Sequence, residues 1–176
     1  MQLSDLEEID TKNMHKTYDQ WPEIAEKSFL ENVKKFESKD IDHIIFCGMG
    51  GSGSIGDILT AILSTTDIHV TNVKGYLLPK TVDDKTVVIC ISISGNTQET
   101  LSVLESAKKK SCKVLAFSSG GKIKEYSNNY DIPYYEISQI HSPRASLPSF
   151  LYCIINVLQD FLPITKDGIV QSIENL

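Results

Sequence analysis

Two hydrophobic patterns alternate along the chain. Short continuous apolar runs are typical of strands that are buried on both faces of a sheet. They predict strands over residues 42–47, 68–73, 86–91, 113–117 and 133–137. Apolar residues spaced by three or four positions indicate helices, because this spacing places them on one helical face. They predict helices from Pro22 to about Glu37, Ile55 to Leu63, Leu101 to Ala107, Ile123 to Tyr126 and Leu147 to Leu162.

The order of these elements predicts the fold. Strands that alternate with helices of this length form parallel sheets with right-handed crossovers and helices on both faces. We therefore expect an α/β protein, a three-layer αβα sandwich around a doubly wound five-stranded parallel sheet. An N-terminal helical arm is expected over residues 1–40 and the sheet domain over residues 41–165. In such sheets a ligand binds beyond the carboxyl ends of the strands, where the strand order reverses.

Length and composition narrow the class of protein. The 176 residues suffice for one domain, and 41% hydrophobic and 23% charged residues are typical of a soluble globular protein. The net charge of −6 argues against nucleic acid as a partner, and the basic run 108–110 fits a solvated helix end. No apolar run reaches membrane-spanning length, and the acidic N-terminus (Asp5, Glu7, Glu8 and Asp10) is unlike a signal peptide. We therefore expect a cytoplasmic protein without a membrane partner.

The segment from Ser92 to Thr100 joins a predicted strand to a predicted helix. The first N–H groups of a helix lack internal partners and the helix dipole is positive there, so such a turn can hold a phosphate without a lysine. The segment also offers three hydroxyl donors, Ser92, Ser94 and Thr97. Gly95 lets the backbone approach a ligand closely. The alternative is an ordinary helix start in which the side chain of Thr97 or Asn96 caps the helix.

A glycine-rich turn from Gly48 to Gly53 repeats this design after the predicted strand 42–47. The coincidence of two such turns favours the phosphate interpretation over helix capping. Gly48, Gly50 and Gly53 also match the G-x-G-x-x-G pattern of dinucleotide-binding folds. That pattern requires an acidic residue at the end of the second strand, but this strand ends in Val73 and Lys74. A sugar phosphate is therefore favoured over a nicotinamide dinucleotide.

The other candidate residues carry weaker signals. Arg144 lies on a loop before the last long helix, where its guanidinium can reach an anionic ligand or remain an exposed loop arginine. The four histidines lack the spacing of metal ligands, and a structural role is favoured for His43 and His69. Four cysteines occur singly, Cys47, Cys90, Cys112 and Cys153, and three of them lie inside apolar segments, which fits buried reduced thiols. We therefore expect neither a metal nor a cofactor.

Together these residues resemble the sugar isomerase (SIS) domain, and within it the bifunctional phosphoglucose/phosphomannose isomerases. The matching segments are 48–53, Tyr76 with Pro79, 92–100, 119–121 and 143–147. Residues 18–22, Tyr-Asp-Gln-Trp-Pro, also resemble the N-terminal segment of that family. The resemblance covers nearly the whole chain and implies the flavodoxin-like form of the sheet.

The resemblance implies a bound phosphosugar. Its substrate-binding residues are Gly50, Gly51, Ser52, Ser92, Ser94, Gly95 and Thr97. Arg144 would lie near the reacting carbons and stabilise an enediolate. The implied reaction converts glucose 6-phosphate or mannose 6-phosphate into fructose 6-phosphate without a metal, with a general base from a second domain. Residues 166–176 resemble the start of a linker helix to that domain.

Assembly and alternative functions follow from the same features. The apolar helical face from Leu147 to Leu162 needs a cover, which together with the second domain implied by the resemblance leads us to expect a homodimer. Two alternative functions remain. A non-catalytic phosphosugar sensor would bind without turnover, and a single-domain isomerase of the hexulose-phosphate isomerase type would be active by itself.

Overall fold

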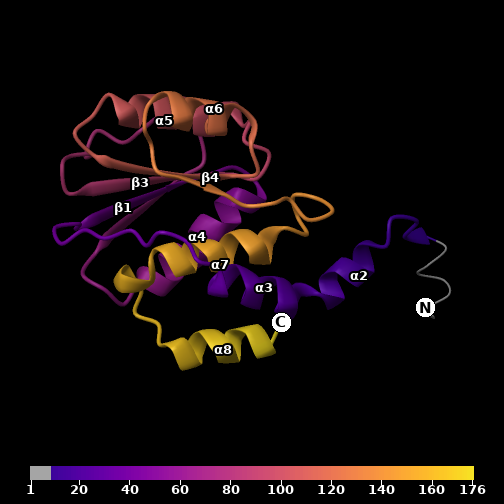
Figure 1. Cartoon of the computed structure of the whole chain (residues 1–176). Helices are drawn as coiled ribbons and strands as arrows, with labels where there is room; N and C mark the ends of the chain where they lie inside the picture. Colours follow the sequence, from indigo (N-terminus) through magenta and orange to yellow (C-terminus); the bar gives the residue numbers. More distant parts are fainter. Residues whose placement is uncertain (1–8) are drawn as a thin grey trace.

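The computed structural model describes residues 9–176, and a parallel sheet with helices on both faces forms their centre (Figure 1). The strands are β1 (His43–Cys47), β2 (His69–Val73), β3 (Thr86–Ser92), β4 (Lys113–Ser118) and β5 (Tyr134–Glu136). They pair in the order β2-β1-β3-β4-β5, and every pair is parallel. The α/β class, the three layers and the five-stranded parallel sheet are confirmed.

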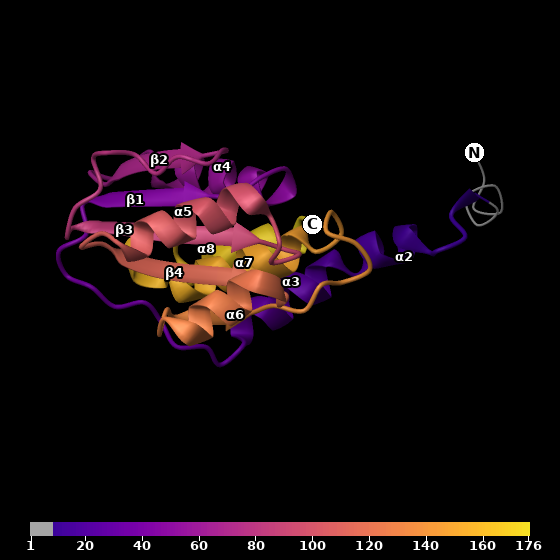
Figure 2. The same ribbon diagram turned by 90° about the horizontal axis from the view of Figure 1, so that it is seen from above.

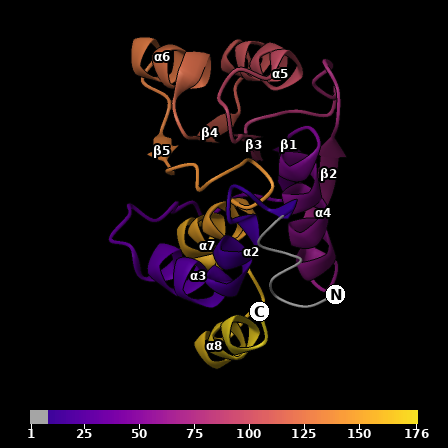
Figure 3. The same cartoon turned by 90° about the vertical axis from the view of Figure 1, so that its right-hand side faces the viewer.

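Helices cover both faces of this sheet. The helices in the described part of the chain include α2 (Met14–Asp19), α3 (Trp21–Leu30), α4 (Gly51–Leu63), α5 (Gln98–Lys108), α6 (Gly121–Asn129), α7 (Leu147–Val157) and α8 (Lys166–Glu174). α5 and α6 lie on one face, and α4, α7 and α3 lie on the other (Figure 2). α8 forms a further layer against α3, on the side away from the sheet (Figure 3). The strand order reverses between β1 and β3, because β2 lies on one side of β1 and β3 on the other.

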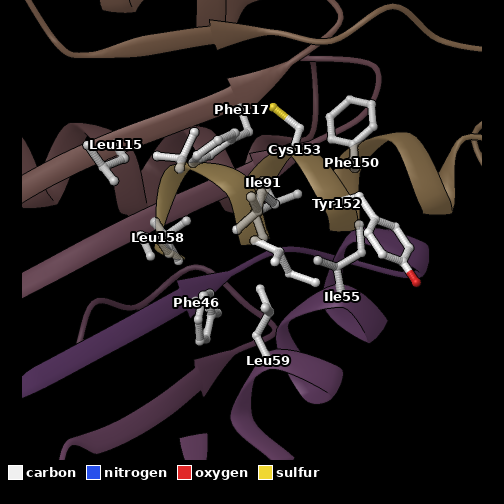
Figure 4. Packing of buried hydrophobic residues seen from close by; sticks show 14 of the residues in the cluster. Phe46, Ile55, Leu59, Ile91, Leu115, Phe117, Phe150, Tyr152, Cys153 and Leu158 are labelled. Carbon is white, nitrogen blue, oxygen red and sulfur yellow. The ribbon is translucent and has the colours of Figure 1, made fainter. Parts of the chain in front are cut away.

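The core explains why the two central strands read as continuous apolar runs. Every residue of β1 and β3 is buried, as required of strands covered on both faces. On one face Phe46, Ile91 and Phe117 of the sheet pack against side chains of α4 and α7 (Figure 4). These helical side chains are Ile55, Leu59, Phe150 and Cys153, and Leu158 directly after α7 joins them. The other face packs against α5 and α6 through a second cluster that includes Ile45, Val88 and Leu104.

The N-terminal helix ends earlier than the sequence predicted. α3 ends at Leu30, not near Glu37. The following residues make hydrogen bonds to α7 that a continued helix would break: the Asn156 amide donates to the Glu31 carbonyl (2.9 Å), and the Phe36 N–H donates to the Val157 carbonyl (2.9 Å). The apolar side chain of Phe36 still packs on the core, stacked on Phe161 at 5.3 Å between ring centres. Packing therefore explains its apolar character without a helix.

The last long helix is also shorter than predicted. α7 ends at Val157, and a short 3-10 helix, η1 (Gln159–Phe161), follows it. Pro163 accounts for the end of the helical segment, because a residue before proline is driven out of the helical conformation. Leu162 accordingly has an extended backbone, with φ −92° and ψ 132°. The apolar face of α7 is buried within the chain, so it no longer gives a reason to expect a dimer.

Three other expectations concern burial and location. Cys47, Cys90 and Cys153 are buried free thiols, as predicted, and Cys112 is half-buried. Residues 1–8 of the predicted arm lie outside the described residues, and with them Asp5, Glu7 and Glu8 of the acidic N-terminus. None of the helices within residues 9–176 combines the length and the apolar character needed to cross a membrane.

Candidate functional site

The two turns predicted to bind phosphate leave the sheet side by side. Cys47 at the end of β1 pairs in register with Cys90 near the end of β3. The glycine-rich turn follows β1 and the serine-rich loop follows β3, so both begin at the carboxyl edge, where the strand order reverses. This is the position at which ligands bind in open parallel sheets.

The glycine-rich turn leads directly into the N-terminus of α4. Gly50 occupies the N-cap position with φ 55° and ψ −125°, a backbone conformation that side-chain-bearing residues rarely adopt. No side chain within residues 9–176 caps this helix end. Gly51 starts the helix, and Ser52 follows as a buried hydroxyl in the first turn. The N-terminus of α4 therefore presents backbone donors and the positive end of its dipole without a competing side chain.

The serine-rich loop leads into α5, and its geometry contradicts the helix-capping alternative. Thr97 occupies the N-cap position but makes no side-chain cap. Its hydroxyl is instead 2.9 Å from the Ser92 hydroxyl. The Asn96 side chain accepts a hydrogen bond from the Lys122 N–H (3.2 Å), outside α5. Both candidate capping groups are thus engaged elsewhere, and the N-terminus of α5 has no side-chain partner in the described chain.

The turn between β4 and α6 holds the serine-rich loop in place. The Ile123 N–H donates to the Gly95 carbonyl (3.0 Å), and the Ser119 hydroxyl donates to the Ile93 carbonyl (2.6 Å). Gly95 has φ +68°, and a Cβ atom there would lie 1.8 Å from the Gly120 carbonyl oxygen. The structure therefore explains glycine at position 95 by contact with this turn, and its close approach to a ligand stays a prediction.

A cavity of about 320 Å³ joins the two turns to the loop that carries Arg144. Five of the predicted site residues line it: Gly51, Ser52, Ser94, Thr97 and Arg144. The other three predicted residues do not line it. Gly50 occupies the N-cap position of α4, and the buried Ser92 hydroxyl is hydrogen-bonded to the Thr97 hydroxyl. Gly95 contacts the β4–α6 turn. Sequence reasoning missed the apolar part of the wall, Met49, Ile93, Pro143 and Leu147, because apolar residues beside a motif carry no chemical signal.

Arg144 supplies the positive charge of this cavity. It is the only arginine in the sequence, and within residues 9–176 its guanidinium makes no salt bridge. Its loop is closed by the buried hydroxyl of Ser146, which accepts from the Ile140 N–H at 2.8 Å. A guanidinium without an acidic partner and two uncapped helix N-termini all favour negative charge in the same space. The cavity is therefore suited to an anion such as a phosphate ester.

The cavity holds no group that readily carries a proton. Among the described residues that line it there is no aspartate, glutamate, histidine or lysine. A larger cavity of about 480 Å³ lies between α5 and α6, but none of the predicted site residues lines it, although Tyr76 of the segments that resemble the family does. We regard the smaller cavity as the candidate site, because it joins both helix N-termini and Arg144. Residues 9–176 contain no cluster of three metal-ligating side chains.

His43 has a structural environment at the opposite end of β1. Its ring Nε2 is 3.0 Å from the Thr71 hydroxyl, and its ring centre is 4.7 Å from that of His69. Burial lowers the pKa of His43, and the neighbouring charge of His69 lowers it further. Because β1 is parallel to β3, His43 lies at the amino end of the sheet, away from the candidate site. The structural role predicted for this residue is consistent with its contacts.

Comparison with known proteins extends these observations. A family model described as SIS domain matches residues 38–148. A bifunctional phosphoglucose/phosphomannose isomerase from Caldicellulosiruptor bescii is 37% identical over 85% of this chain and 42% of its own length. A protein with the same description from Aquifex aeolicus is 38% identical over 76% of this chain and 43% of its own length. The chain thus spans less than half the length of these curated relatives.

A solved structure from Listeria monocytogenes, described as a candidate sugar-phosphate isomerase, is similar in fold. The TM-score is 0.64 at 17% sequence identity, and 98% of each chain is covered.

Proposed function

The chain belongs to the SIS domain family, and we propose that it is the phosphosugar-binding domain of an aldose-ketose isomerase of hexose 6-phosphates. The proposed reaction interconverts glucose 6-phosphate or mannose 6-phosphate with fructose 6-phosphate. One observation carries the proposal: a single cavity contains two uncapped helix N-termini, the hydroxyls of Ser52, Ser94 and Thr97, and the only arginine of the chain.

The proposed phosphate site is built from both turns. The hydroxyls of Ser52, Ser94 and Thr97 donate to phosphate oxygens, and the N-termini of α4 and α5 contribute backbone N–H groups and dipole charge. The apolar wall, which includes Met49 and Leu147, excludes water from one side of the sugar. Electrostatic attraction of an anion is stronger where water is excluded. The ligand is thus held at its phosphate end without a lysine.

The proposed role of Arg144 concerns the other end of the sugar. Isomerisation moves one hydrogen from carbon 2 of the open-chain aldose to carbon 1. The hydroxyl on carbon 2 loses its hydrogen as it becomes the new carbonyl, and the carbonyl oxygen on carbon 1 gains a hydrogen and becomes a hydroxyl. No atom enters or leaves overall. The intermediate enediolate carries negative charge on oxygen, so a fixed guanidinium stabilises it more than the neutral substrate. The proton carrier is proposed to lie outside this chain.

Calorimetry with the 176-residue chain tests the binding part of this proposal. We expect fructose 6-phosphate and glucose 6-phosphate to bind, and Ser94→Ala to weaken binding by about 1 to 3 kcal/mol, because a charge-assisted hydrogen bond is lost. Ser106→Ala is the matched control, since that hydroxyl donates only to the Ser102 carbonyl of its own helix (2.8 Å). Absence of binding for both hexose phosphates would refute the proposal.

Turnover tests the role of Arg144. A coupled assay of fructose 6-phosphate formation is run with the chain alone and with a polypeptide that supplies the second domain of a relative. We expect activity only with the second polypeptide, and Arg144→Ala should lower kcat more than it raises KM. A loss confined to KM would contradict the enediolate role and leave Arg144 as a binding residue.

The same assay separates the alternative functions. A single-domain isomerase is supported by the Listeria monocytogenes structure, which has this fold over a chain of nearly equal length. It predicts turnover by the chain alone. A phosphosugar sensor predicts binding without turnover under either condition.

The proposal also includes a homodimer in the cytoplasm. The dimer rests on the family resemblance, because the apolar face of α7 is covered within the chain. The cytoplasmic location is the expectation drawn from the sequence. Light scattering that gives a monomer mass at high protein concentration would refute the dimer.

A further inference from the structure

The N-terminal segment from Tyr18 to Pro22 contacts the loop that carries Arg144. Trp21 is the first residue of α3, and its indole N–H donates to the carbonyl of Ala145 at 3.0 Å. The Tyr18 and Trp21 rings pack edge to face, with 4.8 Å between centres and 76° between planes. Ala145 is completely buried. The indole therefore bonds to the backbone one residue beyond Arg144.

Most other hydrogen bonds of this loop are internal. The Ser146 hydroxyl closes the turn onto Ile140, and the Leu147 N–H donates to the Arg144 carbonyl (3.3 Å). These bonds define the shape of the turn, but they do not fix its position relative to the rest of the molecule. Trp21 provides a tie to a different element, α3, which itself packs against α7. A second tie comes from the His141 ring, whose Nε2 donates to the Lys12 carbonyl (3.0 Å).

We propose that Trp21 is a positioning residue for Arg144, a role that rests on the proposed function of the cavity. The Arg144 side chain is exposed and long, so the direction of its guanidinium depends on how firmly its backbone is held. The indole of Trp21 is half-buried, and it bonds to this loop although water is within its reach. The bond holds the guanidinium at the cavity that Arg144 lines together with Ser94 and Thr97. Misplacement of such a group weakens its interaction with the ligand even where the fold is intact.

Nuclear magnetic resonance can identify the signals of both side chains without the use of mutants to assign them. The sequence contains a single tryptophan and a single arginine, so the spectrum of the 15N-labelled chain has one indole N–H signal and one arginine Nε–H signal. We expect Trp21→Phe, which keeps an aromatic ring but removes the donor, to move the Arg144 signal. The matched control is Tyr135→Phe, which removes another aromatic donor, to the Lys34 carbonyl (2.9 Å), and should leave that signal in place. An unmoved Arg144 signal in folded Trp21→Phe protein would overturn the proposal, whether or not any ligand binds.

Two probes separate a positioning role from a general structural one. Inorganic phosphate occupies the hydroxyl and helix sites alone, whereas 6-phosphogluconate also places a carboxylate where enediolate charge would develop. We expect Trp21→Phe to lower the affinity for 6-phosphogluconate about three- to tenfold, which corresponds to the loss of one hydrogen bond. The affinity for inorganic phosphate should change by less than about twofold. In an Arg144→Gln background the same substitution should have less than about a twofold effect on 6-phosphogluconate, because the group it positions is gone.

Each remaining outcome has a definite meaning. Equal losses for both probes, or an undiminished effect in the Arg144→Gln background, would show that Trp21 acts only on general stability and would overturn the proposal. If Trp21→Phe does not fold, the wild-type indole signal decides: it should shift when 6-phosphogluconate binds and not when phosphate binds, and the absence of this difference would overturn it. If the wild-type chain binds neither probe, the proposed function fails, while the Arg144 signal in Trp21→Phe still tests the positioning.

Discussion

Three glycines of this chain separate the two reasons for which a protein requires glycine. Gly95 has φ +68°, and a Cβ there would lie 1.8 Å from the Gly120 carbonyl oxygen, so an alanine meets both backbone strain and a clash. Gly50 has φ +55° but open space around a Cβ, so an alanine meets only the strain. Gly75 has neither restriction. Alanine at each position therefore forms a graded series.

The structure gives the expected magnitudes. Gly75→Ala should change the free energy of unfolding by less than about 0.5 kcal/mol. Any effect should be a slight stabilisation of the folded protein, because alanine restricts the unfolded chain more than glycine does. Gly50→Ala should cost about 1 to 2 kcal/mol, the range for an unfavourable backbone conformation. In Gly95→Ala the clash also pushes the serine-rich loop away from the β4–α6 turn. This displacement breaks the hydrogen bond between the Gly95 carbonyl and Ile123 and the one between Asn96 and Lys122. At about 1 kcal/mol for each bond, the total is about 3 to 4 kcal/mol.

Urea denaturation followed by circular dichroism measures this series. With a slope of about 2 kcal/mol per molar, Gly95→Ala should lower the midpoint by about 1.5 to 2 M, and Gly50→Ala by about 0.5 to 1 M. The slopes should agree among the variants, because the surface exposed on unfolding is the same. A Gly95→Ala protein as stable as Gly50→Ala would refute the reasoning, since the loop would then yield to a Cβ without losing its contacts.

Two further predictions concern titration and thiol reactivity. Burial depresses the pKa of His43 below 6.5, so the unfolded chain binds the proton more tightly than the folded protein does. Stability should therefore fall as the pH drops from about 6.5 to the folded pKa. The charges of Asp42 and Asp83 oppose this depression of the pKa, whereas the charge of His69 adds to it. His43→Gln should flatten the dependence of the urea midpoint on pH in that window, and an unchanged dependence would contradict this account. With a chromogenic disulfide at pH 8, one thiol per chain should react before the others, and Cys112→Ser should abolish that phase, because Cys112 alone is only half-buried. Burial raises the pKa of Cys112 too, but it raises the pKa of Cys153 to about 12. Rapid labelling that survives in Cys112→Ser would show that a buried cysteine is accessible.

The sequence predicted most of this fold because its elements are set by local patterns. The strands at 43–47 and 86–92 are fully buried, and short apolar runs bounded by turn residues are typical of such strands. The errors arise where a distant contact overrides the pattern. Phe36 continues the helical spacing of α3, but its backbone is drawn to Val157, a residue far away in the sequence. α7 ends at Val157, before the predicted end at Leu162, and Pro163 accounts only for the end of the 3-10 helix that follows it.

The candidate site was predictable only in part, for a similar reason. Residue types at strand ends indicate where anion donors lie, so Ser52, Ser94 and Thr97 could be selected from the sequence. Their spacing does not say which side chains face the cavity, and Ser92 is turned into support for Thr97. The tie between Trp21 and Ala145 joins segments distant in the chain, and no local pattern encodes it.

The pair of hydroxyls at the base of the serine-rich loop has a directional consequence. Ser92 and Thr97 carry one hydroxyl hydrogen each, and one of these lies in the 2.9 Å bond between them. Ser92 is buried, whereas Thr97 lines the cavity. When an anion accepts the Thr97 hydrogen, Ser92 must therefore donate its hydrogen to the Thr97 oxygen. Both hydroxyl dipoles then point their positive ends toward the negative charge. The occupant of the cavity thus selects the polarity of a buried hydrogen-bond chain, and a threonine without a ligand is free to reverse it.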